Sequence, residues 1–269
     1  MWRWAVPALA LAVSACTTSS YDFSDVGRAH APARAGDGVA RGPRFEDRDP
    51  HEWDSRAPWT HPVHGTDVSK YQGEVDWRTI RESGISFAFV KATEGGDRVD
   101  DFFARNWTAA RAAGIPRGAY HFFYFCRPAH EQAAWFIRNV PRDPSALPPV
   151  LDMEWNHLSP TCKLRPPAET VHAEMRTFLD ILTRHYGKRP IIYTSVDFYE
   201  HNRLHEFHGY HWWLRSVSAH PHDRYQRRPF LFWQYTGTGI LPGVQGDADL
   251  NVFHGSAAQW RDWLRANTR

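Results

Sequence analysis

Short apolar runs alternate with amphipathic stretches from about residue 61 to the end of the chain, and this alternation restricts the folds that the chain can adopt. Such runs are typical of buried strands, and the longer amphipathic stretches are typical of helices that connect parallel strands. Eight runs qualify as strands, namely residues 63–68, 85–91, 118–123, 149–154, 190–194, 211–215, 230–235 and 250–253. The pattern predicts an α/β domain whose strands close into a barrel.

Helices are clearly marked only between the first five of these strands. Four segments have helical periodicity, namely residues 76–83, 101–113, 129–139 and 168–186. Gly84, Gly114 and Gly187 follow three of them, where glycine commonly ends a helix. Because the later connections carry weaker helix signals, we expect an irregular β/α barrel, similar to a TIM barrel but with reduced helices in its second half.

The first 16 residues have the features of an export signal. Arg3 supplies a positive charge, and residues 5–15 form an apolar stretch that is too short to span a bilayer. Residues 13–16, with the sequence VSAC, resemble a bacterial lipobox, in which the cysteine becomes the lipidated first residue. An ordinary signal peptide with an incidental cysteine is the alternative. We expect export and a lipid anchor on Cys16.

The next segment, residues 17–60, is rich in Ser, Ala, Arg, Gly, Asp and Pro and has few periodic apolar residues. This composition predicts a flexible tether between the signal peptide at residues 1–16 and a barrel domain at residues 61–269. Thr17, rather than an acidic residue, follows the cysteine. By the rule known for enteric bacteria, this favours the outer membrane, and we expect the protein at the periplasmic face of a bacterial membrane.

Charge and composition argue against several classes of function. The formal net charge is only +2, so we expect no nucleic-acid partner. The 16 histidines include no His-Glu-x-x-His motif and no carboxylate set beside them as a partner, so we expect no metal and no other cofactor. The sequence has no second long apolar segment that could span a membrane. We expect a monomer.

Two further cysteines, Cys126 and Cys162, form an even pair in a chain that we expect to reach an oxidising compartment. A disulfide between them is therefore expected. Two unrelated buried thiols are the alternative.

Two acids end the apolar run at residues 149–154. Because side chains alternate along a strand, Asp152 and Glu154 lie on the same side of it. Residues at the carboxyl ends of barrel strands converge on one site, and neighbouring carboxylates raise the pKa of one of the pair. We predict that Glu154 stays protonated near neutrality and acts as a general acid. A solvated or salt-bridged strand end is the alternative.

Two other acids lie at the ends of predicted strands. Asp67 closes the first strand, and Asp249 lies at the last one, so both could reach the same rim. Each alone is more typical of a cap or turn residue, because an Asp side chain readily bonds nearby backbone N–H groups.

Seven segments resemble, in order and spacing, the motifs of the glycoside hydrolase family 25 lysozymes. They are HGTDVS at 64–69, FVKATEG at 89–95, GAYHF at 118–122, LDME at 151–154, IYT at 192–194, WQY at 233–235 and DLN at 249–251. The likeness extends over roughly residues 62–254 and does not include the predicted tether.

This resemblance implies an irregular β/α barrel with an acidic groove and N-acetylmuramidase activity. The bond cut would be the β-1,4 bond between N-acetylmuramic acid and N-acetylglucosamine in peptidoglycan strands. By position, Glu154 would be the proton donor, Asp152 and Asp67 the acids beside it, and Asp249 a fourth acid. The implied substrate-binding residues are Lys91, Glu94, Tyr120, His121, Tyr193, Trp233 and Tyr235.

The chain departs from the common family pattern at residues 123–126 and in the loop at residues 160–162. If Cys126 and Cys162 pair, the loop after Glu154 would be held over one end of the groove. This would restrict which glycan strands enter and would leave the acid positions unchanged.

The mechanism stays open at this point, because the sequence gives no distance between carboxyl groups. A carboxylate, a water molecule or the acetamido group of the substrate could attack, and Asp152 would suit the task of orienting that acetamido group. Two alternative functions also stay open. One is a peptidoglycan-binding lipoprotein without catalysis, and the other is a barrel glycosidase acting on another N-acetylated glycan such as chitin.

Overall fold

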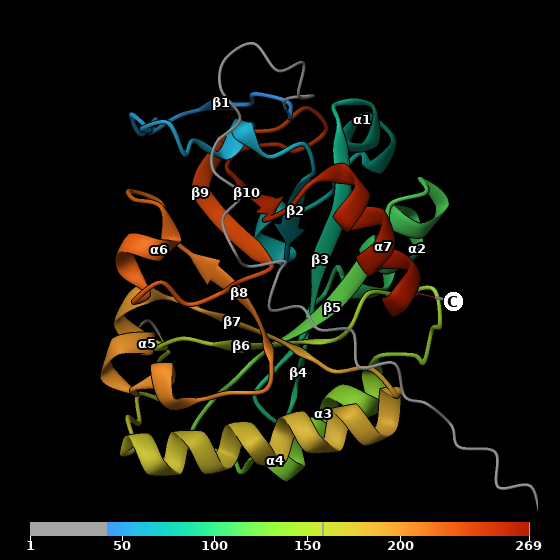
Figure 1. Cartoon of the computed structure of the whole chain (residues 1–269). Coiled ribbons are helices and arrows are strands. Elements are labelled where there is room, and N and C mark those ends of the chain that lie inside the picture. The colour runs from blue at the N-terminus through green and yellow to red at the C-terminus, as the bar shows by residue number, and fades with distance from the viewer. Residues whose placement is uncertain (1–41, 158, 269) are drawn as a thin grey trace, which may run out of the picture.

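The computed structural model describes residues 42–157 and 159–268. In this part of the chain, eight strands close into a barrel (Figure 1). They are β2 (His64–Val68), β3 (Ile85–Glu94), β5 (Arg117–Phe122), β6 (Val150–Met153), β7 (Ile191–Thr194), β8 (His211–Arg215), β9 (Phe232–Ile240) and β10 (Ala248–Phe253). Neighbouring strands from β2 to β9 are parallel, and β10 closes the barrel by pairing antiparallel with both β9 and β2. The predicted α/β barrel is confirmed.

Three of the four helices in the first half of the barrel have 10 to 19 residues, whereas the helices of the later connections between strands have at most six. The first four are α1 (Trp77–Glu82), α2 (Phe103–Ala112), α3 (Ala129–Asn139) and α4 (Ala168–Tyr186), and α3 lies beside α4 (Figure 1). The later connections hold α5 (Val196–His201), the 3-10 helix η4 (Leu204–Glu206) and α6 (Pro221–Arg224). The smaller elements are β1 (Glu46–Asp47), η2 (Pro58–Thr60), η3 (Lys70–Gln72) and β4 (Arg98–Val99). The expected reduction of helices in the second half is therefore confirmed.

Aromatic rings fill the interior of the barrel. The ring of Phe89 stacks on that of Trp213 with centroids 4.5 Å apart, and Phe87 and Phe232 pack beside them. A Cβ atom at Gly65 would lie 2.3 Å from the Phe87 ring, so only glycine leaves room for this ring on β2. The interior of the barrel around these rings is thus a packed core and not a channel.

A final helix, α7 (Ala257–Asn267), closes the amino-terminal end of the barrel (Figure 1). Ser256 and Gln259 form a capping box at its start. Trp260 and Trp263 on its inner face are buried against Phe253 and Phe232. Because this end is plugged, a substrate must approach the carboxyl-terminal end of the strands. The expected elements did not include α7.

The predicted tether is wrong in extent, because residues 42–60 pack on the barrel. Strand β1 pairs antiparallel with the end of β9, and the Trp53 ring lies 5.0 Å from that of Trp233. Arg56 forms a 2.6 Å ion pair with Asp223. Aromatic side chains such as Phe45 and Trp53 supply the apolar contacts, although their spacing follows no regular period.

The other predictions for the amino-terminal region lie outside the described residues. These are the signal peptide at residues 1–16, the lipidation site Cys16 and the first part of the tether at residues 17–41. Within the described parts of the chain, none of the helices combines the length and apolar character needed to cross a membrane.

Candidate active site

The structure brings the four predicted acids together at the carboxyl-terminal mouth of the barrel. Asp67 lies near the end of β2, opposite Asp249 on β10 in the antiparallel pair. Asp152 lies on β6, and Glu154 directly follows this strand. The carboxyl groups are close enough to influence one another, because Asp67 raises the pKa of Asp152, Glu154 and Asp249. Four acids from three strands therefore form one site.

Asp67 is held by two amide side chains from neighbouring strands. Gln234 Nε2 and Asn251 Nδ2 donate to Asp67 Oδ2 over 2.9 and 2.8 Å. The amide oxygens of this pair accept hydrogen bonds from the Tyr193 hydroxyl and from Trp213 Nε1. Each amide is fixed by a bond on both sides, so the Asp67 carboxyl cannot rotate freely. Burial raises the pKa of Asp67 to about 6, although the two amide hydrogen bonds oppose this rise.

Asp152 is buried and incompletely hydrogen-bonded. Its Oδ1 atom has no hydrogen-bond partner among the described residues. Burial raises the pKa of Asp152 well above the ordinary value, and the neighbouring Glu154 carboxylate adds to this rise, whereas Lys91 opposes it. A buried acceptor without a partner costs free energy in the free protein, and this cost is relieved when a ligand supplies a donor.

Glu154 remains partly exposed while its carboxyl group is largely desolvated. Burial raises its pKa to about 7, and the charges of Asp197 and Asp67 contribute, whereas Arg215 and Lys91 oppose the rise. A carboxylic acid with this pKa is protonated in a large fraction of molecules at neutral pH. It can therefore donate a proton to a bound substrate.

Asp249 has a cationic neighbour that was not predicted from the sequence. Burial and the Asp67 charge raise the pKa of Asp249 well above its ordinary value, and Arg215 opposes this rise. A Cβ atom at Gly237 would lie 3.2 Å from Asp249 Oδ1 and 3.9 Å from Arg215 Nη2, so this glycine leaves space beside both groups. The position of Arg215 at the carboxyl end of a predicted strand was the available signal.

The predicted residues Lys91 and Glu94 lie at the mouth as an ion pair. Lys91 Nζ is 2.6 Å from Glu94 Oε2, and it lies over the Phe122 ring. Burial would lower the pKa of Lys91, but Glu94 outweighs this effect and raises it. The ammonium group stays charged and supplies a positive field to the acids, including Asp152 and Glu154.

Tyr120 and Tyr193, which the sequence predicts to bind substrate, lie next to the acids inside the barrel. Both project into the barrel below the acids, where they pack against Trp213. Burial raises the pKa of Tyr120 far above its ordinary value, and the charges of Asp67 and Asp152 act in the same direction. Both phenols therefore remain neutral and can act as hydrogen-bond donors.

The predicted substrate-binding role is wrong for three residues, because their side chains are buried on the outer side of the strands. His121 bonds to Thr93 and Gln132 under the helices and stacks on Phe178. Trp233 is buried beneath Trp53.

Tyr235 is the third of these residues, and it packs against His64 on the same outer side. Side chains alternate along a strand. Because Tyr120 points into the barrel, the next residue, His121, points outward. In the same way Gln234 points inward and its neighbour Trp233 points outward. Gln234 and Asn251, which do face the site, stand in the sequence motifs at residues 233–235 and 249–251, but the sequence assigns them no role.

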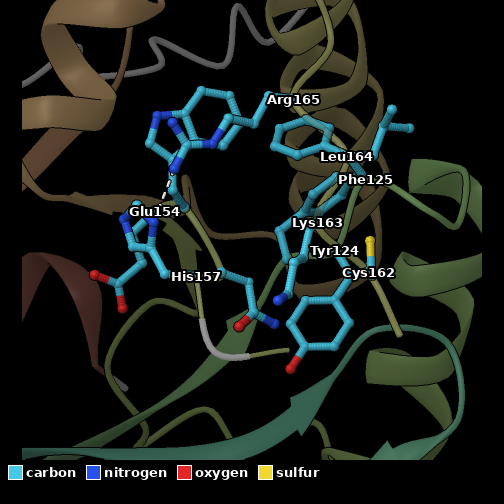
Figure 2. Close-up of a pocket in the computed structure, with 11 residues that line it drawn as sticks. Tyr124, Phe125, Glu154, His157, Cys162, Lys163, Leu164 and Arg165 are labelled. Carbon is cyan, nitrogen blue, oxygen red and sulfur yellow. Dashed lines mark hydrogen bonds between the residues drawn. The ribbon is translucent and has the colours of Figure 1, made fainter. Parts of the chain in front are cut away.

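A cavity of about 200 Å³ adjoins Glu154 on the outer side of the mouth. It lies between the segment after β5 and the loop after β6, and a disulfide between Cys126 and Cys162 joins these two segments. Figure 2 shows Glu154 and His157 on one side of the cavity, with Lys163 and Tyr124 on the other. The site therefore extends beyond the four acids.

Metal-binding groups are not assembled in the described parts of the chain. Residues 42–157 and 159–268 contain no cluster of three or more His, Cys, Asp or Glu side chains that could hold a metal ion.

The comparisons with known proteins agree with this arrangement. The family described as "Glycosyl hydrolases family 25" matches residues 66–244. The chain is 36% identical over 220 residues to the protein YegX of Escherichia coli O6:H1, covering 78% of this chain and 76% of YegX. It is 37% identical over 219 residues to lysozyme M1 of Streptomyces globisporus, covering 74% of this chain and 70% of that lysozyme. A family 25 glycosyl hydrolase structure from Bacillus anthracis aligns with a TM-score of 0.71 at 36% identity, covering 81% of this chain and 98% of that one.

Proposed function

The chain belongs to glycosyl hydrolase family 25, and we propose that the acids at its barrel mouth hydrolyse peptidoglycan with Glu154 as the proton donor. The protein is a glycoside hydrolase of the lysozyme type. It is an N-acetylmuramidase that cuts the β-1,4 bond between N-acetylmuramic acid and N-acetylglucosamine. The observation that supports Glu154 is its pKa of about 7 at a partly exposed position beside a second, buried carboxyl group.

In this proposal Glu154 gives its proton to the glycosidic oxygen as the bond between that oxygen and C1 of the muramic acid breaks. The positive charge that develops on the sugar ring is stabilised by nearby carboxylates. Asp67, with its carboxyl group fixed by Gln234 and Asn251, suits this task, because a preorganised anion needs no reorientation during the reaction. Glu154, now ionised, later takes a proton from the attacking water.

Asp152 is proposed to orient the acetamido group of the substrate. Its unpaired Oδ1 is placed to accept the acetamido N–H, and this bond increases the electron density on the acetamido oxygen. That oxygen then attacks C1 and is displaced by water in a second step. Two displacements at C1 retain the configuration of the sugar. This assignment favours substrate assistance over direct attack by a carboxylate.

The cellular placement completes the proposal. An enzyme that cuts peptidoglycan acts outside the cytoplasm, which agrees with an export signal at residues 1–16. We propose further that Cys16 carries a lipid anchor, that this anchor holds the enzyme at the periplasmic face of the outer membrane, and that the enzyme acts as a monomer. The lipobox-like sequence before Cys16 and Thr17 after it support the anchor and the membrane.

The experiment that tests the function is digestion of purified peptidoglycan sacculi with the purified protein. We expect the turbidity of the suspension to fall and soluble reducing ends to appear, whereas colloidal chitin should release none. Binding to sacculi without any release of reducing ends would contradict the proposal and favour a binding protein without catalysis. Release from chitin at a comparable rate would favour a glycosidase with a different substrate.

The pKa values predict a narrow pH optimum. Glu154 must be protonated to act as an acid, so activity should fall about tenfold per pH unit above its pKa of about 7. Asp67 must be ionised to stabilise positive charge and Asp152 must be ionised to polarise the acetamido group. Activity should therefore also fall on the acid side as Asp67, with a pKa of about 6, and Asp152, with a raised pKa, become protonated. Because these carboxyl groups interact, the apparent pKa values on the acid and alkaline sides of the pH profile belong to the group of carboxyls and not to single residues. Initial rates on sacculi between about pH 4 and 9 test this, and a flat profile above pH 7 would contradict Glu154 as the acid.

A further inference from the structure

The cavity beside Glu154 differs in charge from the rest of the mouth. The catalytic end carries four acids, whereas the loop after β6 presents Lys163 and Arg165 to the cavity. In the described residues no carboxylate forms an ion pair with either of these two cations. By contrast, Lys91 at the mouth is paired with Glu94. One wall of the cavity therefore carries two cations that have no carboxylate ion-pair partner in the described parts of the chain, and Glu154 lies on the other side.

The wall is held in place by several contacts. Ser159 Oγ accepts a hydrogen bond from the backbone N–H of Cys162 over 2.9 Å, and the disulfide ties Cys162 to the segment after β5. The Arg165 guanidinium lies 4.9 Å from the centre of the Trp155 ring and bonds to His157 Nδ1. A preorganised cation of this kind loses little entropy when it binds an anion.

Two further features of the cavity suit a peptide. Leu164 lies between the two cations in sequence and is 56% exposed, which is unusual for a large apolar side chain. On the cavity lining, the buried Nδ2 atom of Asn156 lies near the Tyr124 hydroxyl but makes no hydrogen bond of good geometry among the described residues. A ligand with carboxylates, small apolar side chains and backbone carbonyls would use all of these groups.

We propose that this cavity binds the acidic peptide stem that peptidoglycan carries on the lactyl group of N-acetylmuramic acid. The inference rests on the proposed function, because the muramic acid residue must be bound beside Glu154 for its glycosidic bond to be cut. Its lactyl substituent then leaves the sugar within reach of the adjoining cavity. Where the stem is present, the lactyl carboxyl group is bound in the amide that joins it, so the glycan gives Lys163 and Arg165 no carboxylate to bind. The carboxylates of the stem are then the anions that these cations can reach.

The test compares two substrates, namely glycan strands that carry their stems and strands from which an amidase has removed them. The measured quantity is the ratio of kcat/KM for the first substrate to kcat/KM for the second. We expect this ratio to fall about tenfold in the double variant Lys163→Gln, Arg165→Gln, which corresponds to about 1.4 kcal/mol. Arg261→Gln on α7, an exposed residue at the opposite end of the barrel, is the matched control and should keep the wild-type ratio.

The variant Lys163→Glu provides a second test, because Lys163 is exposed and its replacement should not impair folding. Its ratio should fall further than that of Lys163→Gln, and added salt should reduce the wild-type ratio. An unchanged ratio in both variants would overturn the inference. An equal loss on both substrates would also overturn it, since the cations would then bind the lactyl carboxylate or the glycan. If the wild type cleaves neither substrate, the proposed function itself fails.

Discussion

Replacing Glu154 with Gln is expected to lower kcat on peptidoglycan by about 10²–10⁴-fold, with little change in KM. Glutamine keeps the size and polarity of the side chain but has no acidic proton to give to the leaving oxygen. Because burial raises the pKa of Glu154 to about 7 and so favours its neutral form, we expect this position to accept a neutral glutamine. Binding of the glycan should therefore survive while bond cleavage is lost, which cleavage and sedimentation assays on the same sacculi would show.

The matched control for this variant is Glu82→Gln on α1. Glu82 is exposed, and its ion-pair partner in the described parts of the chain is Arg78 at the surface, so its replacement should leave activity and stability nearly unchanged. If Glu154→Gln kept more than about a tenth of the wild-type kcat, another group would have to supply the proton.

Replacing Asp152 with Asn is expected to lower kcat by about 10²-fold and at the same time to stabilise the folded protein at neutral pH. An asparagine cannot supply the charge that polarises the acetamido group, so the first step should slow. Rates on sacculi measure this loss. An unchanged kcat would contradict the proposed role of Asp152.

The effect of Asp152→Asn on stability follows from the raised pKa of Asp152 in the folded protein. Below the ordinary pKa of an aspartate, about 3.9, Asp152 is protonated in both the folded and the unfolded protein. Its titration then does not lower the free energy of unfolding. As pH rises, the unfolded state ionises first, so the free energy of unfolding of the wild type falls until pH exceeds the folded pKa.

Asparagine does not titrate and avoids this loss. At about pH 8 the Asp152→Asn variant should therefore melt at a higher temperature than the wild type. The difference should shrink near pH 4. Thermal unfolding followed by circular dichroism at both pH values tests this, and a variant that melts lower at pH 8 would show that Asp152 supports the fold rather than the reaction.

The barrel could be predicted because its strands are buried on both faces and read as continuous apolar runs. Helix α7 was not expected, although its sequence carries helix signals: Ser256 and Gln259 form a capping box, and Trp260, Trp263 and Leu264 follow at helical spacing. The packing of residues 42–60 was also missed. A few aromatic side chains at irregular intervals, such as Trp53, can attach an otherwise polar segment to a surface.

The acids of the site could be predicted, but several of their neighbours could not. Asp152 and Glu154 follow from strand alternation and from their place at a strand end. The same alternation, applied from Gln234, would have directed Trp233 away from the groove. Arg215 carried no motif, and its influence on Glu154 and Asp249 depends on the closure of the barrel between β8 and β9.

The most direct test of the central claim is the identity of the sugar at the new reducing end of digested peptidoglycan. The digest would be reduced with borohydride, hydrolysed in acid and analysed for amino sugar alcohols, with the Glu154→Gln variant processed in parallel. The muramidase assignment predicts muramitol from the wild-type digest and no reduced amino sugar above background from the variant. Glucosaminitol as the product, or equal yields of muramitol from both proteins, would contradict it.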